Sequence, residues 1–444
     1  MTKPLFALHH ARRNSGLTFH EIALIAREEA VAHPDCFVTV CSVEEIKAQV
    51  ATIKARLDAG QSQPLAGLTF CIKDNIDLEG YPSTGNCPEY GECAGETAPA
   101  VQLALEAGAI VIGKNTMDQF ATGLNGTRSP DPICRNALDP NIISGGSSSG
   151  SGVAVAKGIC DFSFGSDTGG SGRVPAAANG IVGFKPTPGL VSGRGMVYCN
   201  RSFDVIPIFA KTVGDAQAVF DVIGGADPLD PFAFKGGIRD ASLGIGQNFA
   251  IPSALDHFGD PIAQAAHQRN LEQLKSAGAT LTEIDFGPFA EAGDLVFSSA
   301  LVAERLIDYG DFIADNQDAV LAPVATAISA GLSYSARDAF EVLHRLAELT
   351  LQCTQVLGEF DALVLPTIPR LFTVAEMQAE PMSRNSIMGT YTYFANPLGL
   401  SAVAVPGVAR DDTLPSSLCF VGLGGADCIL LALAQAFEAL AVDG

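Results

Sequence analysis

The chain has 444 residues, of which 47% are hydrophobic and 17% charged, and its formal net charge is −22. This composition is typical of a folded α/β protein and argues against a disordered, collagen-like or coiled-coil chain. The negative charge argues against nucleic acid as a direct partner, because phosphates are bound through clustered Lys and Arg. We therefore assign the charge to solubility.

The 11 cysteines are scattered and never follow the Cys-x-x-Cys spacing. This argues against a metal cluster and against a disulfide framework. No apolar run reaches the roughly 18 residues that span a bilayer, and the first residues lack the apolar core of a secretion signal. We expect a cytoplasmic protein that binds no metal and contacts no membrane.

Two amphipathic helices are predicted near the N-terminus. Each starts with a capping box, in which a hydroxyl side chain and a Glu three residues later bond to each other's backbone amides: Thr18 with Glu21, and Ser42 with Glu45. Gly60 is a C-terminal stop for the second helix. Residues 1–60 are expected to form an outer helical layer.

From Leu65 onward, short β-rich runs alternate with helical segments. This pattern predicts an α/β fold with a mixed, mostly parallel central β-sheet covered by helices on both faces. The segment 227–237 is interpreted as a surface loop, so residues 1–444 are treated as one domain. The predicted strands are LTFCI (68–72), AIVIG (109–113), SLGIG (242–246), TLTEID (280–285), DALVLP (361–366) and SAVAVP (401–406).

Serine and glycine concentrate in residues 144–173, which read SGGSSSGSGVAVAKGICDFSFGSDTGGSGR. The run VAVAKGI predicts a helix and FSF predicts a strand. The glycines therefore belong to turns around ordered elements, where the backbone approaches closely or takes a positive φ. Such turns suit three kinds of chemistry.

Two of these chemistries, phosphate binding and a hydrolase elbow, require residues that the sequence lacks at the necessary positions. The run GAIVIGK is similar to a phosphate-binding loop, but Asn115 follows it where that loop has a Ser or Thr that binds magnesium. Its central residues AIVI are also more typical of a buried strand than of a loop. A hydrolase elbow would use Ser148 in G-x-S-x-G, but it needs a preceding strand and a later His. His257, His267 and His344 follow it, and each is expected on the solvated surface.

The third chemistry uses a lysine as the base. Lys73 ends the run LTFCI, and the turns SGGSSSG and SDTGGSGR follow it in order. This combination resembles the amidase signature family, whose catalytic set is a Lys, a Ser preceded by a cis peptide bond, and a nucleophilic Ser in a D-T-G-G-S turn. The resemblance assigns these roles to Lys73, Ser147 and Ser171. It spans a catalytic core at 64–190, recurs weakly at DALVLPT and ANPLGLSAVAVPG, and implies a homodimer without a cofactor.

In the mechanism that this implies, Ser171 attacks the amide carbonyl and Ser147 passes its proton to a neutral Lys73. Burial must then lower the pKa of Lys73 to ~7 to 8, and Asp74 must point away. The backbone amides of Thr168, Gly169, Gly170 and Ser171 are predicted to form the oxyanion hole. Asp167 and Arg173, which flank the turn, are either braces or a surface ion pair.

Within the family, DQFATGLNGTRSP and GSGRVPAAANGIVGFKPT are most similar to the amidase domain of allophanate hydrolases. Those enzymes carry a Tyr and, eight residues later, an Arg on one helix, and both hold a small anionic substrate. Here the helix reads FSSALVAER, so Arg305 can offer a bidentate contact to a carboxylate, but Phe297 replaces the Tyr. Taken alone, Glu304 and Arg305 would be a solvated helix pair. The resemblance also implies a substrate contact at Gly123.

We therefore expect an amidase that releases ammonia from a small linear amide. The first expectation is allophanate or a related ureido or carboxylated amide. The alternatives are a broad or arylalkyl amidase, a glutaminase-type subunit of a tRNA-dependent amidotransferase, and a degenerate member kept for binding. The sequence ends after the helix CILLALAQAFEAL, so no C-terminal accessory domain is expected.

Overall fold

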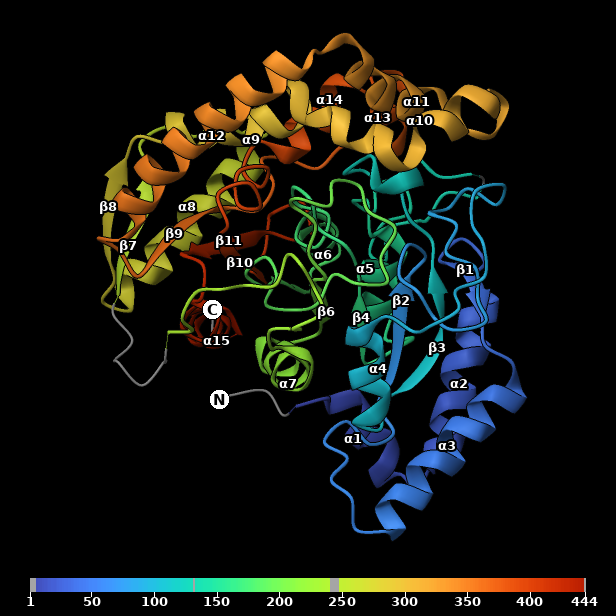
Figure 1. Ribbon diagram of the computed structural model, residues 1–444. Coiled ribbons are helices and arrows are strands. Elements are labelled where there is room, and N and C mark those ends of the chain that lie inside the picture. The colour runs from blue at the N-terminus through green and yellow to red at the C-terminus, as the bar shows by residue number, and fades with distance from the viewer. Residues whose placement is uncertain (1–4, 131, 240–246, 443–444) are drawn as a thin grey trace.

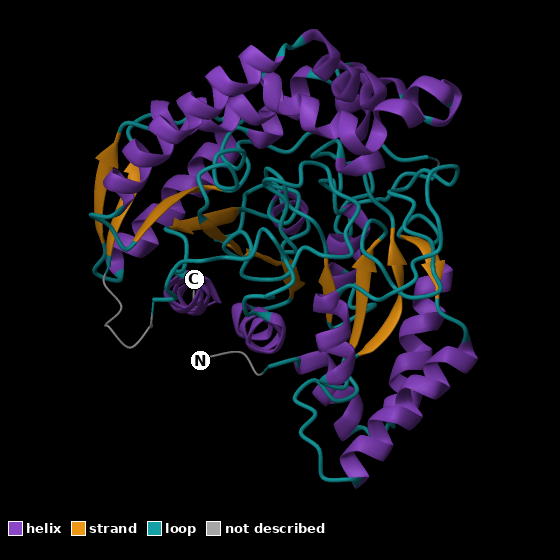
Figure 2. Cartoon of the chain, viewed as in Figure 1, coloured by secondary structure: helices purple, strands orange, loops and turns teal. Residues whose placement is uncertain are grey.

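An 11-stranded sheet runs through the chain in the order β1-β3-β2-β4-β6-β5-β10-β11-β9-β7-β8 (Figures 1 and 2). The computed structural model describes residues 5–130, 132–239 and 247–442. The strands are β1 (Phe37–Val40), β2 (Thr69–Lys73), β3 (Ile110–Asn115), β4 (Phe162–Phe164), β5 (Val182–Lys185), β6 (Ile208–Ala210), β7 (Asn248–Pro252), β8 (Thr280–Ile284), β9 (Ala362–Pro366), β10 (Ser401–Pro406) and β11 (Ser417–Gly422).

The predicted mixed sheet is confirmed, but it is not mostly parallel. Among the strands that the structure describes, β3, β2 and β4 pair in parallel, as do β9, β7 and β8. The pairings between these two groups, and that of β1 with β3, are antiparallel, so six of the ten pairings are antiparallel. The alternation of strands and helices in the sequence does not reveal this, because strand direction depends on where each connection returns.

Helices flank the sheet. Helix α5 contacts β2, β3 and β4, α6 contacts β5 and β10, and α15 contacts β10, β11 and α7. Figure 1 shows α9 to α14 gathered across the top of the molecule, above the loops that leave the sheet. The helices are α1 (Ala7–Asn14), α2 (Phe19–Ala32), α3 (Val43–Asp58), α4 (Pro99–Glu106), α5 (Ser149–Ala156), α6 (Val174–Ala178), α7 (Val213–Ile223), α8 (Pro261–Ser276), α9 (Gly287–Ser298), α10 (Leu306–Asp315), α11 (Ala322–Ser329), α12 (Ala336–Leu357), α13 (Val374–Ala379), α14 (Ser383–Gly389) and α15 (Asp427–Val442), with 3₁₀ turns η1 (Gln119–Ala121), η3 (Ala300–Arg305), η4 (Gln317–Ala319) and η5 (Ala330–Ser333).

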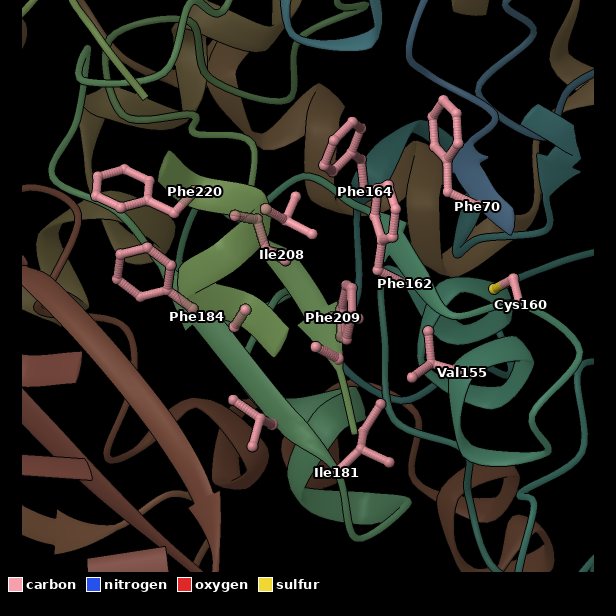
Figure 3. Packing of buried hydrophobic residues seen from close by; sticks show 14 of the residues in the cluster. Phe70, Val155, Cys160, Phe162, Phe164, Ile181, Phe184, Ile208, Phe209 and Phe220 are labelled. Atoms are coloured by element: carbon pink, nitrogen blue, oxygen red, sulfur yellow. The ribbon is translucent and has the colours of Figure 1, made fainter. Parts of the chain in front are cut away.

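Aromatic side chains from β2 and β4 pack together in the core. Phe70 and Phe162 are paired across the two strands, and their rings stack at 5.0 Å with an interplanar angle of 6°. Phe164 lies against both rings (Figure 3). All three side chains are fully buried. This cluster fixes the relative position of β2 and β4, whose ends carry the site.

Both predicted capping boxes are confirmed, at Thr18 with Glu21 and at Ser42 with Glu45. The first sixty residues are not purely helical, because β1 pairs with β3 at the sheet edge. The predicted strand at 242–246 lies outside the described residues, and β5, β6, β7 and β11 were not predicted. The helix and strand predicted inside the Ser/Gly-rich segment correspond to α5 and β4.

The prediction of solvated histidines is wrong for two of the three. His257 and His267 are buried and their rings lie 5.8 Å apart, against the β9 end of the sheet rather than beside the Ser/Gly-rich turns. Their sequence neighbours are polar, but helix α8 turns His267 inward. His344 is exposed, as predicted. No helix within the described ranges is long and apolar enough to cross a membrane.

Candidate active site

The ends of β2 and β4 bring Lys73 to the Ser/Gly-rich turns. The two strands are parallel, so their carboxyl ends meet at the same edge of the sheet. Lys73 is the last residue of β2, and Ser166 lies two residues beyond β4. Lys73 Nζ lies 2.6 Å from Ser147 Oγ and 2.8 Å from Ser166 Oγ, which also accepts a hydrogen bond from Asn75 Nδ2. Two hydroxyl groups thus hold the amine in place.

Burial makes Lys73 a candidate base. Its side chain is fully buried, and this burial lowers the pKa of Lys73 from 10.5 to about 7, although acidic neighbours such as Asp204 favour the charged form. Asp74 does not oppose the shift, since it lies near Lys114 (3.7 Å) and accepts the Asn86 amide. The predicted orientation of Asp74 away from Lys73 is therefore confirmed, although Asp74 is itself buried.

The turn that carries Ser147 packs against Asp118 and is bonded to its backbone amide. The Gly146–Ser147 peptide bond is cis, as the family resemblance implied. The backbone amide of Asp118 donates to the Ser147 carbonyl oxygen (2.9 Å), and Asp118 Oδ2 accepts the amide of Gly126 (3.1 Å). A Cβ atom at position 146 would lie 2.0 Å from Asp118 Oδ2. Only glycine fits there.

Ser148, the nucleophile of the elbow alternative, is engaged elsewhere. Its hydroxyl donates to the Ser166 carbonyl oxygen (3.1 Å), and the side chain is fully buried. It does not line the cavity described below, whereas Ser171 does. The geometry therefore favours Ser171 over Ser148 as the reactive hydroxyl.

Asp167 and Arg173 brace the turn that carries Ser171. Both are fully buried, and the guanidinium makes two 3.0 Å hydrogen bonds to the carboxylate, so the pair does not lie on the surface. Burial alone would raise the pKa of Asp167, but the charge and hydrogen bonds of Arg173 outweigh it and the pKa lies below its ordinary value. Arg173 also donates to the Thr392 carbonyl oxygen (2.9 Å) and thereby ties the turn to the loop after α14.

Three of the four predicted oxyanion-hole amides are free to donate. Gly170 donates its amide to Asp167 Oδ1 (2.7 Å), which corrects its predicted role as a donor. Gly170 is nevertheless required by shape, because its φ is +135° and a Cβ would lie 2.3 Å from Thr392 Oγ1. Within the described parts of the chain, no partner is found for the amides of Thr168, Gly169 and Ser171.

A cavity of about 210 Å³ opens onto Ser171. The three residues predicted to contact substrate, Gly123, Phe297 and Arg305, all line it. Phe297 and Arg305 do not share one helix as predicted, because α9 ends at Ser298 and Ser299 caps η3. The remaining lining residues are Ala121, Thr122, Leu124, Arg128, Thr168, Gly169, Thr326, Ala327, Ala330, Met382, Asn385, Ser386 and Tyr393.

Arg128 and Tyr393 are among several polar cavity residues that were not predicted from the sequence. Arg128 belongs to the segment DQFATGLNGTRSP, whose similarity to allophanate hydrolases gives this side chain no role. Tyr393 lies in the loop between α14 and β10, and its ring centroid is 4.2 Å from that of Phe297. No local motif marks Tyr393, because only the fold brings it beside α9. Arg305, which could have been a solvated residue, is 3% exposed, with Cζ 5.1 Å from the Phe297 ring centroid.

Among the residues that the structure describes, no group of three or more His, Cys, Asp or Glu side chains is arranged to hold a metal ion. The site is instead built from one amine, several hydroxyls, backbone amides and two guanidinium groups. These groups can move protons and bind oxygen atoms that carry negative charge.

Comparison with known proteins places this geometry in a family. The chain is 35% identical over 428 residues to urea amidolyase of Lachancea kluyveri, covering 94% of this chain but only 23% of that protein. It thus spans less than a quarter of that relative's length. It is also 33% identical over 459 residues to a subunit of the glutamyl-tRNA(Gln) amidotransferase of Deinococcus radiodurans, covering 94% of this chain and 92% of the relative.

Solved structures agree with the sequence relatives. Kluyveromyces lactis allophanate hydrolase superposes with a TM-score of 0.93 at 32% identity, covering 99% of this chain and 73% of that one. The amidase family model matches residues 22–431. The chain therefore belongs to the amidase signature family.

Proposed function

We propose that this protein hydrolyses a small linear amide through an acyl-enzyme formed on Ser171. The observation that carries the proposal is a buried Lys73 whose pKa is lowered to about 7 and whose Nζ lies 2.6 Å from Ser147 Oγ, together with Ser171 in the lining of the cavity. A lysine in this state is neutral for much of the time at neutral pH and can accept a proton.

In the proposed reaction, Ser171 Oγ attacks the amide carbon while its proton passes to Ser147 Oγ, whose own proton passes to Lys73 Nζ. The free amides of Thr168, Gly169 and Ser171 supply the donors for the negative oxygen of the tetrahedral intermediate. The relay then runs in reverse to protonate the leaving nitrogen, and ammonia departs. Water hydrolyses the acyl-enzyme by the same relay and restores Ser171.

For the substrate we propose allophanate or a related ureido or carboxylated amide. Arg305 in the cavity supports a carboxylate, because a guanidinium binds one in a charge-assisted geometry. The similarity to urea amidolyase and allophanate hydrolase supports the same class. The similarity to the glutamyl-tRNA(Gln) amidotransferase relative favours one alternative, release of ammonia from glutamine in an assembly with other chains.

Two measurements test this proposal. A fluorophosphonate probe followed by peptide mass spectrometry should label Ser171, and the Ser148→Ala control should be labelled like the wild type. Labelling confined to Ser148 would contradict the mechanism. The purified chain alone should release ammonia from allophanate, whereas release from glutamine only in the presence of partner chains would establish the amidotransferase alternative.

We further propose a cytoplasmic homodimer. Nine of the 11 cysteines are buried thiols that form no disulfide with any described residue, which suits a reducing compartment. The homodimer is supported only by the family resemblance. Light scattering of the purified protein at micromolar concentration should give twice the 46.1 kDa chain mass, and a mass of 46.1 kDa would contradict the dimer.

A further inference from the structure

Two buried guanidinium groups in the cavity lack an acidic partner. Arg305 is 3% and Arg128 is 4% exposed, and neither forms an ion pair with any described residue. Arg305 Nη2 and Arg128 Nε are buried without a hydrogen-bond partner. Burying unpaired charge is costly, so such a pair indicates a place that a negative ligand fills.

Neutral oxygens orient both guanidinium groups without cancelling their charge. Arg128 donates to the carbonyl oxygens of Thr122 (3.0 Å) and Pro381 (2.7 Å), and Arg305 Nε donates to Asn200 Oδ1 (2.8 Å). The carboxylate of Asp118 accepts backbone amides, including that of Arg128, rather than the guanidinium. Asp118 still acts on Arg128 through its charge, but Arg128 Nε and Arg305 Nη2 remain without a hydrogen-bond partner and can donate to a ligand.

Tyr393 adds a neutral donor beside them. Its hydroxyl has no hydrogen-bond partner among the residues described, and the side chain is nine-tenths buried at the cavity wall. Burial raises the pKa of Tyr393 to about 12, although Arg128 and Arg305 both act to lower it. The hydroxyl thus stays protonated at neutral pH and can donate. Phe297, against which its ring packs, has no hydroxyl to offer.

We propose that Arg128, Arg305 and Tyr393 form one anion clamp that grips the carboxylate of the substrate. The proposal rests on the amidase function proposed above and adds Arg128 and Tyr393 as specificity-determining residues. Tyr393 supplies, from the neighbouring ring, a hydroxyl that Phe297 lacks. The cavity of about 210 Å³ that these residues share with Ser171 suits a small amide whose carboxylate lies near the scissile bond.

A matched pair of substrates isolates the clamp. Malonamate and malonamide have the same size and both contain a primary amide, but only malonamate carries a carboxylate. Ammonia release should give a higher kcat/KM for malonamate in the wild type. In Tyr393→Phe the ratio of the two kcat/KM values should fall about ten- to hundredfold, the size of a hydrogen bond to a charged group. Arg128→Lys should also lower the ratio, because the ammonium keeps the charge but loses the fixed fork.

Two further variants guard against trivial effects. Tyr391→Phe removes a hydroxyl two residues away, which bonds to the backbone of Asp256 outside the cavity, and the ratio should stay at its wild-type value. Phe297→Tyr placed in the Tyr393→Phe chain should recover part of the lost preference, since it returns a hydroxyl to the adjacent ring. If the preference for malonamate is not recovered, the idea that a hydroxyl on either of these two rings can serve the clamp is wrong.

A binding measurement separates the clamp from the chemistry. Calorimetry with malonamate on Ser171→Ala should give a Kd at least tenfold lower than on Ser171→Ala with Tyr393→Phe. If the wild type hydrolyses neither of these amides nor allophanate, yet this difference in Kd appears, the amidase proposal fails and the clamp stands. The clamp is wrong if Tyr393→Phe lowers kcat/KM equally for malonamate and malonamide. It is also wrong if the two Kd values for malonamate agree.

Discussion

Amide hydrolysis should slow about tenfold for each pH unit below 7, because only the neutral form of Lys73 can accept a proton. Burial lowers the pKa of Lys73 from 10.5 to about 7. One pKa unit corresponds to 1.36 kcal/mol, so burial destabilises the charged form of Lys73, relative to the neutral form, by about 5 kcal/mol. At pH 7.5 roughly three quarters of the lysine is neutral, against about one part in a thousand without the shift.

The lowered pKa of Lys73 also affects the free energy of unfolding. Between pH 7 and pH 10.5 the unfolded chain binds more protons at this lysine than the folded chain does. Its contribution to the free energy of unfolding therefore falls as the pH falls through that window. The catalytic base is thus obtained at the expense of stability near neutral pH.

The assay is kcat/KM from ammonia release between pH 5.5 and 9, which reports groups of the free enzyme. Lys185 is the matched control, because burial also lowers its pKa to about 7 but its amine donates to the Pro186 carbonyl oxygen outside the cavity. In the wild type, the plot of log kcat/KM against pH should change slope near pH 7, and we call this change the break. Lys73→Met should lower the rate about 10²- to 10⁴-fold and remove the break, whereas Lys185→Met should keep it. A break that survives Lys73→Met, or a wild-type rate that still rises tenfold per pH unit up to pH 9, would refute the reasoning.

Three other perturbations test the frame around the site. Arg173→Met leaves the Asp167 carboxylate buried without its partner and should lower the free energy of unfolding by about 3–5 kcal/mol, measured by urea denaturation. Gly170→Ala places a methyl group against Thr392 at a positive φ, so it should cost about 1–3 kcal/mol and lower kcat, and unchanged values would contradict the tight turn. Ser42→Ala removes a helix cap far from the cavity and should cost about 1 kcal/mol with no effect on kcat.

Local signals predicted the elements that short-range chemistry specifies. The capping boxes at Thr18 and Ser42 and the buried strand ending at Lys73 follow from neighbours in the sequence. The catalytic triplet depended on recognising a family pattern, since nothing in the spacing alone brings Lys73 to Ser147.

The missed features depend on contacts between distant segments. Strand β1 is a four-residue run that only its pairing with β3 makes a strand. The turn sequence predicts Gly170 as an oxyanion donor, but the geometry of the turn gives its amide to the Asp167 carboxylate. Tyr393 enters the cavity because Arg173 ties the neighbouring Thr392 to the Ser171 turn, which no local pattern reports.

The cavity takes part of its wall from a stretch of the chain that carries none of the reactive groups. Lys73, Ser147 and Ser171 fall within residues 73–171, whereas Phe297 and Tyr393 come from α9 and the loop before β10. Mutations in the second stretch can change which amide is admitted while the proton path stays intact. Such a division lets a duplicated gene acquire a new substrate while the catalytic residues stay unchanged. Placing a hydroxyl on one or the other of two adjacent rings requires only one or two substitutions of this kind.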